Sequence, residues 1–280
     1  MKQLVTGLVV DVGWEYVSTW VESLRASGYS GEAALVTMRC EPELYEQCAK
    51  YDVRTFNADP EELNTRVRSN FVVGRFLPFG RMIGENYPDH FVLATDVRDV
   101  FFQRDPFEFF AGESDLNRLF VSPEEVAHDD GSLPGRWNAR KMEDVFSERI
   151  RQEAAGLPIY CAGIICGPGR LVADVFRIIY LLCFNYKGPG GDQVAYCLML
   201  EREPYRSLMT AIGLEQGWAV NWGAITRAPI PEDKKPVIEN GVAKTRSGNP
   251  FHILHQYDRV PAANELVSGQ MEALRTRPTR

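Results

Sequence analysis

Two aspartates that follow a short apolar run form the pattern in this sequence with the clearest chemistry. The run Phe91 to Ala94 reads as a buried strand, and Asp96 and Asp99 follow it, three positions apart. In a parallel sheet, the carboxyl end of such a strand opens on the crevice where α/β proteins bind ligands. Carboxylate oxygens suit a hard cation such as Mg²⁺ or Mn²⁺, which in turn binds the oxygens of a diphosphate. The alternative is that both aspartates only form a turn and pair with Arg98 or Arg104.

The longer string from Thr95 to Phe107 resembles the metal-binding motif of GT-A glycosyltransferases in its Asp-x-x-Asp form. The resemblance implies that Asp99 binds a divalent cation directly, and that Asp96 contacts either the metal or the ribose of a nucleotide-sugar. It implies Mn²⁺ or Mg²⁺ as the cofactor. The commoner spacing in the family is Asp-x-Asp, so the division of roles between the two carboxylates stays open.

Two histidines near the C-terminus, His252 and His255, are candidates for a further metal ligand. Many GT-A enzymes close the metal shell with a late histidine, and the run His255 to Arg259 resembles that element. Residues three apart in a strand point to opposite faces, so only one histidine should reach the metal. We expect it to be His255, and imidazole favours Mn²⁺ over Mg²⁺. A core histidine that is satisfied by backbone groups is the alternative for each.

The segment Gly190-Gly191-Asp192-Gln193 is expected to begin a helix after a glycine turn. A carboxylate there is stabilised by the free N–H groups and the helix dipole, so helix capping alone would explain Asp192. The resemblance implies a second role. In an inverting transfer, Asp192 would be the general base that removes the proton of the acceptor hydroxyl. The Asp-Gln pair also resembles retaining members, which leaves the stereochemistry open.

Further positions are assigned to donor binding by the same resemblance. Arg75 is expected to contact a donor phosphate or the first aspartate, because a guanidinium suits both, and a solvated helix arginine is the alternative. Gly163 is expected to let the sugar approach the backbone of a strand. Cys161 stands on that strand where the family pattern has asparagine. Thr6 and Asp11, in the first strand and its exit loop, are expected to contact the nucleoside base.

Aromatic side chains are the candidates for an acceptor site, because their faces stack against the C–H groups of sugars. A core role is the alternative for each of them. The Asp129 to Gly135 stretch, expected to be a long loop, adjoins the first candidate. The candidates are Trp137, Tyr160, Tyr186, Trp218 and Trp222.

The elements that must position these residues follow an α/β pattern. Short apolar runs rich in β-branched residues alternate with longer segments of helical period. This alternation predicts a Rossmann-like, mostly parallel sheet flanked by helices, the GT-A type of fold. Neither a repeat nor a linker is apparent, so we expect one domain over residues 1–280, with nucleotide and metal binding in its N-terminal half and acceptor binding in its C-terminal half. The expected strands are Leu4–Val10, Ala33–Thr37, Phe91–Ala94 and Ile159–Ile165, and the expected helices include Tyr16–Ala26, Leu63–Glu85, Leu171–Asn185 and Asp192–Glu201.

The composition restricts the partners. With a net charge of −7 and a sequence pI near 5.3, the chain lacks the basic field that nucleic acid or an anionic membrane requires. No signal-peptide pattern and no apolar run of membrane-spanning length is present. We expect a cytoplasmic protein, in the host-cell cytoplasm if it is viral. Six cysteines without paired spacing predict buried thiols, with disulfides or a zinc site as the alternative.

The compact length of the chain and the wording of its segments also resemble the small xylosyltransferases with which chloroviruses build capsid glycans. This narrower resemblance implies a UDP-xylose donor, an oligosaccharide or glycoprotein-glycan acceptor, and inversion at the anomeric carbon. A retaining transfer from a UDP-hexose is the first alternative. A metal-dependent nucleotidyltransferase or phosphohydrolase is disfavoured, because the chain has neither a phosphate loop of the GxxxxGK[ST] kind nor a second carboxylate cluster. A non-catalytic glycan-binding protein is the last alternative.

Overall fold

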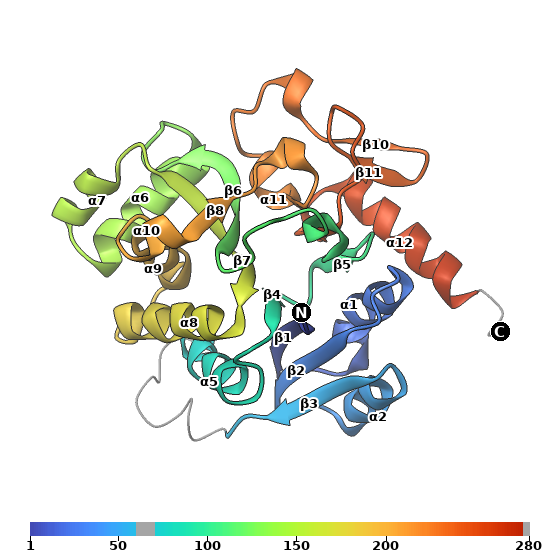
Figure 1. Cartoon of the computed structure of the whole chain (residues 1–280). Helices are drawn as coiled ribbons and strands as arrows, with labels where there is room; N and C mark the ends of the chain where they lie inside the picture. Colours follow the sequence, from blue (N-terminus) through green and yellow to red (C-terminus); the bar gives the residue numbers. More distant parts are fainter. Residues whose placement is uncertain (60–70, 277–280) are drawn as a thin grey trace.

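A seven-stranded sheet forms the centre of the computed structural model, which describes residues 1–59 and 71–276 (Figure 1). The strand order is β3-β2-β1-β4-β7-β6-β8. The strands are β1 (Gln3–Val10), β2 (Glu32–Met38), β3 (Val53–Asn57), β4 (Phe91–Thr95), β6 (Leu119–Ala127), β7 (Pro158–Pro168) and β8 (Met209–Ala211).

Strand directions make this sheet mostly parallel, as the sequence predicted. β1 pairs in parallel with β2 and with β4, β2 pairs in parallel with β3, and β6 with β8. β7 runs antiparallel to both of its neighbours, β4 and β6. The chain moves outward from β1 to β3 and returns to β4 on the other side of β1. That reversal creates a crevice at the carboxyl ends of β1 and β4, which is where open α/β sheets bind ligands.

Helices cover both faces of the sheet. On one face, Val5 of β1 packs with Val17 and Trp20 of α1 (Trp14–Ala26), and α2 (Pro42–Lys50) joins the same core. On the other face, Leu4 packs into a core that is formed with α5 (Phe76–Asn86), α8 (Gly169–Cys183) and α9 (Gly191–Leu200). Neighbouring strand residues point to opposite faces, so one apolar run supplies both cores.

A small sheet of order β5-β12-β9 brings the C-terminal part of the chain to the main crevice. β12 (Ile253–His255) lies between β5 (Val100–Phe102), which follows Asp99, and β9 (Ala219–Asn221). Its register sets His255 opposite Val100 on one side and opposite Asn221 on the other. The remaining elements of this region are the hairpin β10 (Val237–Glu239) and β11 (Val242–Lys244), and the helices α11 (Trp222–Ile225) and α12 (Pro261–Arg275).

Two expected elements differ from the structure. Part of the expected helix Leu63–Glu85 falls outside the described residues, and the described part is divided at Arg75 into α4 (Phe71–Gly74) and α5. The expected loop Asp129–Gly135 is shorter than predicted, because α6 (Leu133–Val145) already begins within it. The Ser132 side chain caps that helix by accepting a 3.0 Å hydrogen bond from the Gly135 N–H. Two further short helices are α7 (Glu148–Ala154) and α10 (Tyr205–Leu208).

All six cysteines are free thiols. Five are buried and Cys40 is half-buried, in agreement with the prediction of core thiols. Within residues 1–59 and 71–276, no helix has the length and apolarity that crossing a membrane would require.

Candidate active site

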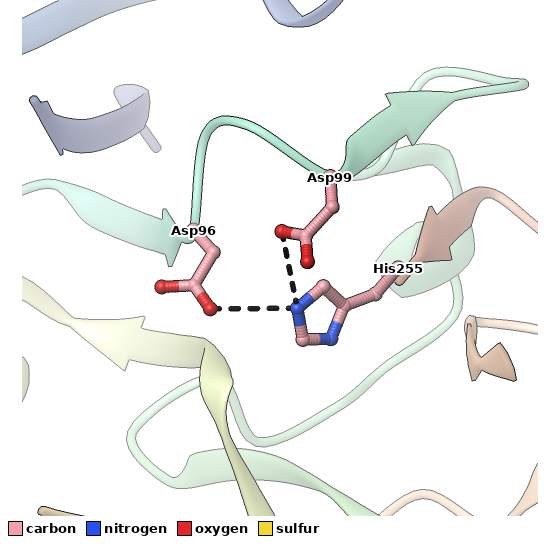
Figure 2. A group of neighbouring side chains, drawn as sticks. All are labelled: Asp96, Asp99 and His255. Carbon is pink, nitrogen blue, oxygen red and sulfur yellow. Dashed lines mark ion pairs between the residues drawn. The ribbon is translucent and has the colours of Figure 1, made fainter. Parts of the chain in front are cut away.

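Two carboxylates and an imidazole from distant parts of the chain meet at the crevice (Figure 2). Asp96 follows β4, Asp99 precedes β5, and His255 ends β12. The Nε2 atom of His255 lies 3.4 Å from Oδ2 of Asp96 and 3.8 Å from Oδ1 of Asp99. One ligand atom of each residue lies within 4.8 Å of the others, and no other trio of His, Cys, Asp or Glu in the described part of the chain meets this condition.

The donor set fits a divalent cation. His255 and Asp99 are buried. The Nε2 atom of His255 makes no hydrogen bond, although it lies within ion-pair distance of both carboxylates. A buried nitrogen without a hydrogen bond is costly, so a further polar partner is expected for it. Ligand atoms that share an ion at about 2.1 Å from its centre lie about 3–4 Å apart, and both distances from Nε2 fall in this range. Two carboxylates and one imidazole suit Mn²⁺ or Mg²⁺.

Opposite charges across the site shift the pKa values of these groups in opposite directions. Burial raises the pKa of Asp96, but Arg75 and His255 lower it by a larger amount, so the net pKa is below its ordinary value. Burial lowers the pKa of His255, whereas Cys161, Asp96 and Asp99 raise it, and the net pKa is well above its ordinary value. A cation and a proton compete for the same imidazole nitrogen, so metal affinity should increase with pH.

His252 immediately precedes β12 and contacts other residues than His255 does. Its Nδ1 atom is 2.6 Å from the carbonyl oxygen of Asp105, and its ring packs edge-on against Phe109 at 5.9 Å between centroids. It is buried and does not join the Asp96, Asp99 and His255 group. The two histidines are therefore separated as the period of a strand predicts.

Arg75 connects the two carboxylates that the sequence assigned to different roles. Its guanidinium donates a 2.9 Å hydrogen bond to Oδ1 of Asp96 and a 3.4 Å hydrogen bond to Oδ2 of Asp192. The residue stands at the break between α4 and α5, where its side chain can leave the helix surface and enter the crevice. It also pairs two negative charges that would otherwise repel each other.

Asp192 is the second residue of α9, and its side chain is buried. Gly190, with φ +82°, makes the turn before the helix and is its N-cap residue, so no side chain there caps the N-terminus of α9. Burial raises the pKa of Asp192; Arg75 opposes this effect and the negative charge of Asp96 adds to it, with a net increase. A carboxyl with a raised pKa is better matched to proton transfer near neutral pH than an ordinary aspartate is.

Gly163 leaves room for two of the candidate metal ligands. A Cβ atom at this position would lie 2.6 Å from Oδ2 of Asp96 and 2.7 Å from Cε1 of His255. Its carbonyl oxygen also accepts a 2.9 Å hydrogen bond from the Asp96 N–H. The missing side chain therefore leaves the space that the carboxylate and the imidazole occupy.

A pocket of about 580 Å³ adjoins the start of α1, and Asp11, Gly13, Trp14 and Tyr16 are among its lining residues. Asp11 pairs with Arg39, whose Nε lies 2.7 Å from the carboxylate. Sequence reasoning missed Trp14 and Tyr16, although both stand in the first turn of α1. Burial raises the pKa of Tyr16, and Asp99 and Asp96 add to this increase whereas Arg98 and Arg75 oppose it.

The prediction for Thr6 is corrected, because the side chain is fully buried within β1 and does not line this pocket.

The alternative role of the two aspartates, pairing with Arg98 or Arg104, is observed in part. Arg98 donates a 3.1 Å hydrogen bond to Asp99 and also pairs with Asp258. Arg104 instead pairs with Glu108.

A groove of about 400 Å³ is lined by Gln193, which follows Asp192 in the sequence, and by Gln256, which follows His255. Trp137, which is 42% exposed, lines it together with Gln193, Glu124 and Arg259. Glu124 and Gln193 are further residues that the sequence analysis did not assign. A buried acid inside the apolar strand β6 is a signal that could have pointed to Glu124, since unpaired acids are rarely fully buried.

The five aromatic candidates divide between surface and core. Lys141 lies about 6 Å from the ring centroids of both Trp137 and Tyr186, and donates a 3.1 Å hydrogen bond to the Tyr186 hydroxyl. Three predictions are corrected, because these side chains are buried and offer no face to a ligand. Tyr160 bonds Glu201, Trp218 packs against Phe109 and Phe110, and Trp222 belongs to the core under α12.

Comparison with solved structures relates the fold to glycosyltransferases, whereas no protein-family model and no curated protein sequence matches the chain. The galactosyltransferase LgtC, in complex with donor and acceptor sugar analogs, superposes with a TM-score of 0.62 at 11% identity over 98% of this chain and 97% of that one. An active-site glutamine-to-glutamate mutant of LgtC gives 0.61 at 12% identity, with the same coverage. The apo form of the glycosyltransferase GlyE from Streptococcus pneumoniae gives 0.52 at 13% identity, over 100% of this chain and 65% of that one. The chain therefore has the GT-A fold.

Proposed function

We propose that this protein is a metal-dependent glycosyltransferase that moves a sugar from a nucleotide-sugar to a hydroxyl group of a glycan. The observation that carries the proposal is the meeting of Asp96, Asp99 and His255 at the crevice of a GT-A fold. Gln193 and Gln256, which follow Asp192 and His255 in the sequence, line the groove beside Trp137. Tyr16 lines the separate pocket at the start of α1, and the charges of Asp96 and Asp99 affect its hydroxyl. We therefore assign the pocket to the donor and the groove to the acceptor.

The donor would bind with its nucleoside in the pocket of Asp11, Trp14 and Tyr16 and with its diphosphate at the metal site. Mn²⁺, or Mg²⁺ as the second choice, would neutralise the diphosphate and make it a better leaving group. Asp96, Asp99 and His255 would hold the cation. Arg75 donates a hydrogen bond to Asp96, and its guanidinium could also turn to a phosphate oxygen.

Asp192 is the proposed general base. It would accept the proton of the acceptor hydroxyl as that oxygen attacks the anomeric carbon, where the bond to the diphosphate breaks. Its burial and its raised pKa support this role. The acceptor would lie in the groove beside Trp137, with Tyr186 near its edge, because an exposed aromatic face can stack against a sugar ring.

For the donor sugar, we propose xylose from UDP-xylose with inversion, on the sequence resemblance alone. A hexose donor and a retaining transfer are the second candidate. The similarity to a protein named a galactosyltransferase favours the hexose. Gln193, next to Asp192, lines the groove. LgtC also has a glutamine in its active site, which its glutamine-to-glutamate mutant replaces.

The direct test is turnover of UDP-sugars by the purified protein with and without Mn²⁺. UDP-xylose, UDP-galactose and UDP-glucose would be compared by release of UDP, and UDP-, GDP- and CMP-sugars by thermal shift, because a ligand that binds the folded state raises its apparent stability. We expect metal-dependent release of UDP and a metal-dependent increase in Tm. Anomeric configuration of the product, read by NMR, would separate inversion from retention.

The same experiment separates the other classes of function. A glycan-binding protein would bind sugars without releasing UDP. A phosphohydrolase would split UDP or a simple diphosphate ester with no preference for the sugar. Either result would overturn the proposal.

A further inference from the structure

The thiol of Cys161 lies on the far side of the His255 ring from the two aspartates. Its Sγ atom is 3.3 Å from Nδ1 of His255, whereas Nε2 of the same ring faces Asp96 and Asp99. Both side chains are at most 2% exposed. The two ring nitrogens point in different directions. A cation held by Nε2 and the two carboxylates is therefore out of reach of the sulfur at Nδ1.

Asn221 supplies a further hydrogen-bond donor to this sulfur, because it directs Nδ2 toward Sγ at 3.5 Å. A sulfur that already accepts from an amide can also accept from Nδ1–H of His255. An imidazole that carries its proton on Nδ1 has Nε2 available as a metal ligand.

The contact is anchored by a buried carboxylate. Asn221 donates a second, 3.0 Å hydrogen bond to Oε1 of Glu124, and both residues are at most 9% exposed. The chain of contacts thus runs from Glu124 through Asn221 to Cys161 and ends at His255. Glu124 lines the groove beside Trp137, so this chain joins the floor of the groove to the candidate metal site.

We propose that Cys161 is a positioning residue, whose sulfur fixes the orientation and the Nδ1–H tautomer of His255 and thereby aims Nε2 at the metal site. Asn221 holds the sulfur in place, and Glu124 holds Asn221. The proposal rests on the proposed function, in which His255 binds a cation. Partners of this kind behind a metal-binding histidine typically change metal affinity by about 10–100-fold when they are removed.

The first measurement follows the ring proton directly. The protein has four histidines, so nitrogen-edited NMR can resolve their ring signals, and the signal that is absent from His255→Gln identifies His255. We expect the wild type to show a solvent-protected Nδ1–H for His255. In Cys161→Ala this signal should shift or exchange rapidly with water, because the proton has lost its acceptor.

The second measurement is the affinity for Mn²⁺, determined by calorimetry without any sugar. We expect Cys161→Ala to raise the Kd by about 10–100-fold. Cys161→Ser retains an acceptor atom and should recover most of the affinity and the protected ring proton. Cys166→Ala is the matched control, because Cys166 is an equally buried thiol on the same strand but belongs to the core under α1. It should lower Tm to a similar degree and leave the ring signal and the Kd unchanged.

Two outcomes would overturn the proposal. One is a wild-type ring with no proton on Nδ1, since the thiol would then be the donor. The other is a Cys161→Ala protein whose ring signal and Kd equal those of Cys166→Ala. If the wild type binds no Mn²⁺, the proposed function loses its metal, but the ring proton still decides whether Cys161 positions His255.

Discussion

Arg75 donates a 2.9 Å hydrogen bond to Asp96 across 21 positions of sequence, and the same guanidinium reaches Asp192 across 117. One positive charge thus serves a candidate metal ligand and the candidate base. Because it is the cation that opposes the effect of burial on Asp192, its removal should be visible in the pH dependence of turnover.

For Arg75→Gln we expect the acidic limb of the kcat profile to move to higher pH. Arg75 lowers the pKa of Asp192, so its loss raises that pKa, and the base then stays protonated, and inactive, to a higher pH. Arg104→Gln, which removes an exposed arginine from its pair with Glu108, is the control and should leave the profile in place. An unshifted acidic limb in Arg75→Gln would contradict the assignment of Asp192.

For Asp99→Asn we expect turnover to fall to the level that the wild type shows without metal, with loss of the Mn²⁺-dependent part of UDP-sugar affinity. The amide keeps the shape of this buried side chain but removes the charge that binds a cation. Calorimetry with Mn²⁺ and UDP measures the effect. Asp89→Asn, an exposed aspartate paired with Arg170, is the control. Unchanged binding in a folded Asp99→Asn protein would remove the metal site from the proposal.

For His255→Ala and His252→Ala we expect opposite profiles. His255→Ala should lose turnover at limiting Mn²⁺ and regain part of it at high Mn²⁺, because two carboxylate ligands remain. His252→Ala should lower Tm, since it removes a buried ring and its 2.6 Å contact with the Asp105 carbonyl, but it should keep the wild-type Mn²⁺ dependence. Titration of turnover against Mn²⁺ distinguishes the two, and an exchange of these phenotypes would show the assignment to be wrong.

For Gly163→Ala we expect weaker Mn²⁺ binding in a folded protein. The added methyl group would lie under 3 Å from both Asp96 and His255, so one of them must move. Gly112→Ala is the control, because a Cβ atom there meets no atom within 4 Å. The Kd for Mn²⁺ is the readout, and equal values for the two variants would show that the close contact does not matter.

For Asp192→Asn we expect nearly unchanged donor affinity and a loss of turnover of about 10²–10⁴, the usual effect of removing a general base. The amide keeps the size of the side chain but cannot accept the proton. If Asp192 only stabilises the start of α9, the variant should instead show a lower Tm and near-normal turnover. An α-linked product from a UDP-α-sugar would exclude inversion and reassign the residue.

Much of the α/β frame could be predicted from the sequence, because local patterns encode it. The apolar runs of β1 and β4 and the helical period of α1 and α8 appear within single segments, and each was expected within a few residues of its observed bounds. Short elements with little pattern were missed. β12 has three residues, and its pairing with β5 and β9 depends on segments far away in sequence.

The burial of individual side chains was predicted less well than the strands and helices were. Trp218 and Trp222 were candidates for a sugar platform, yet both are enclosed by core residues, and Thr6 is fully buried in β1. An aromatic residue can serve either in a core or at a surface. Only the packing of neighbouring elements decides between the two.

The sequence by itself determined that two carboxylates follow a buried strand, that an acid begins a helix after a glycine turn, and that two late histidines point opposite ways. Each of these depends on the period of one strand or one helix. The tertiary structure alone decided that His255 meets Asp96 and Asp99, that Gly163 leaves room for them, and that Cys161 lies behind the imidazole. These contacts are set by strand order and register between distant segments, and a local sequence pattern contains no information about which distant segment will pair with it.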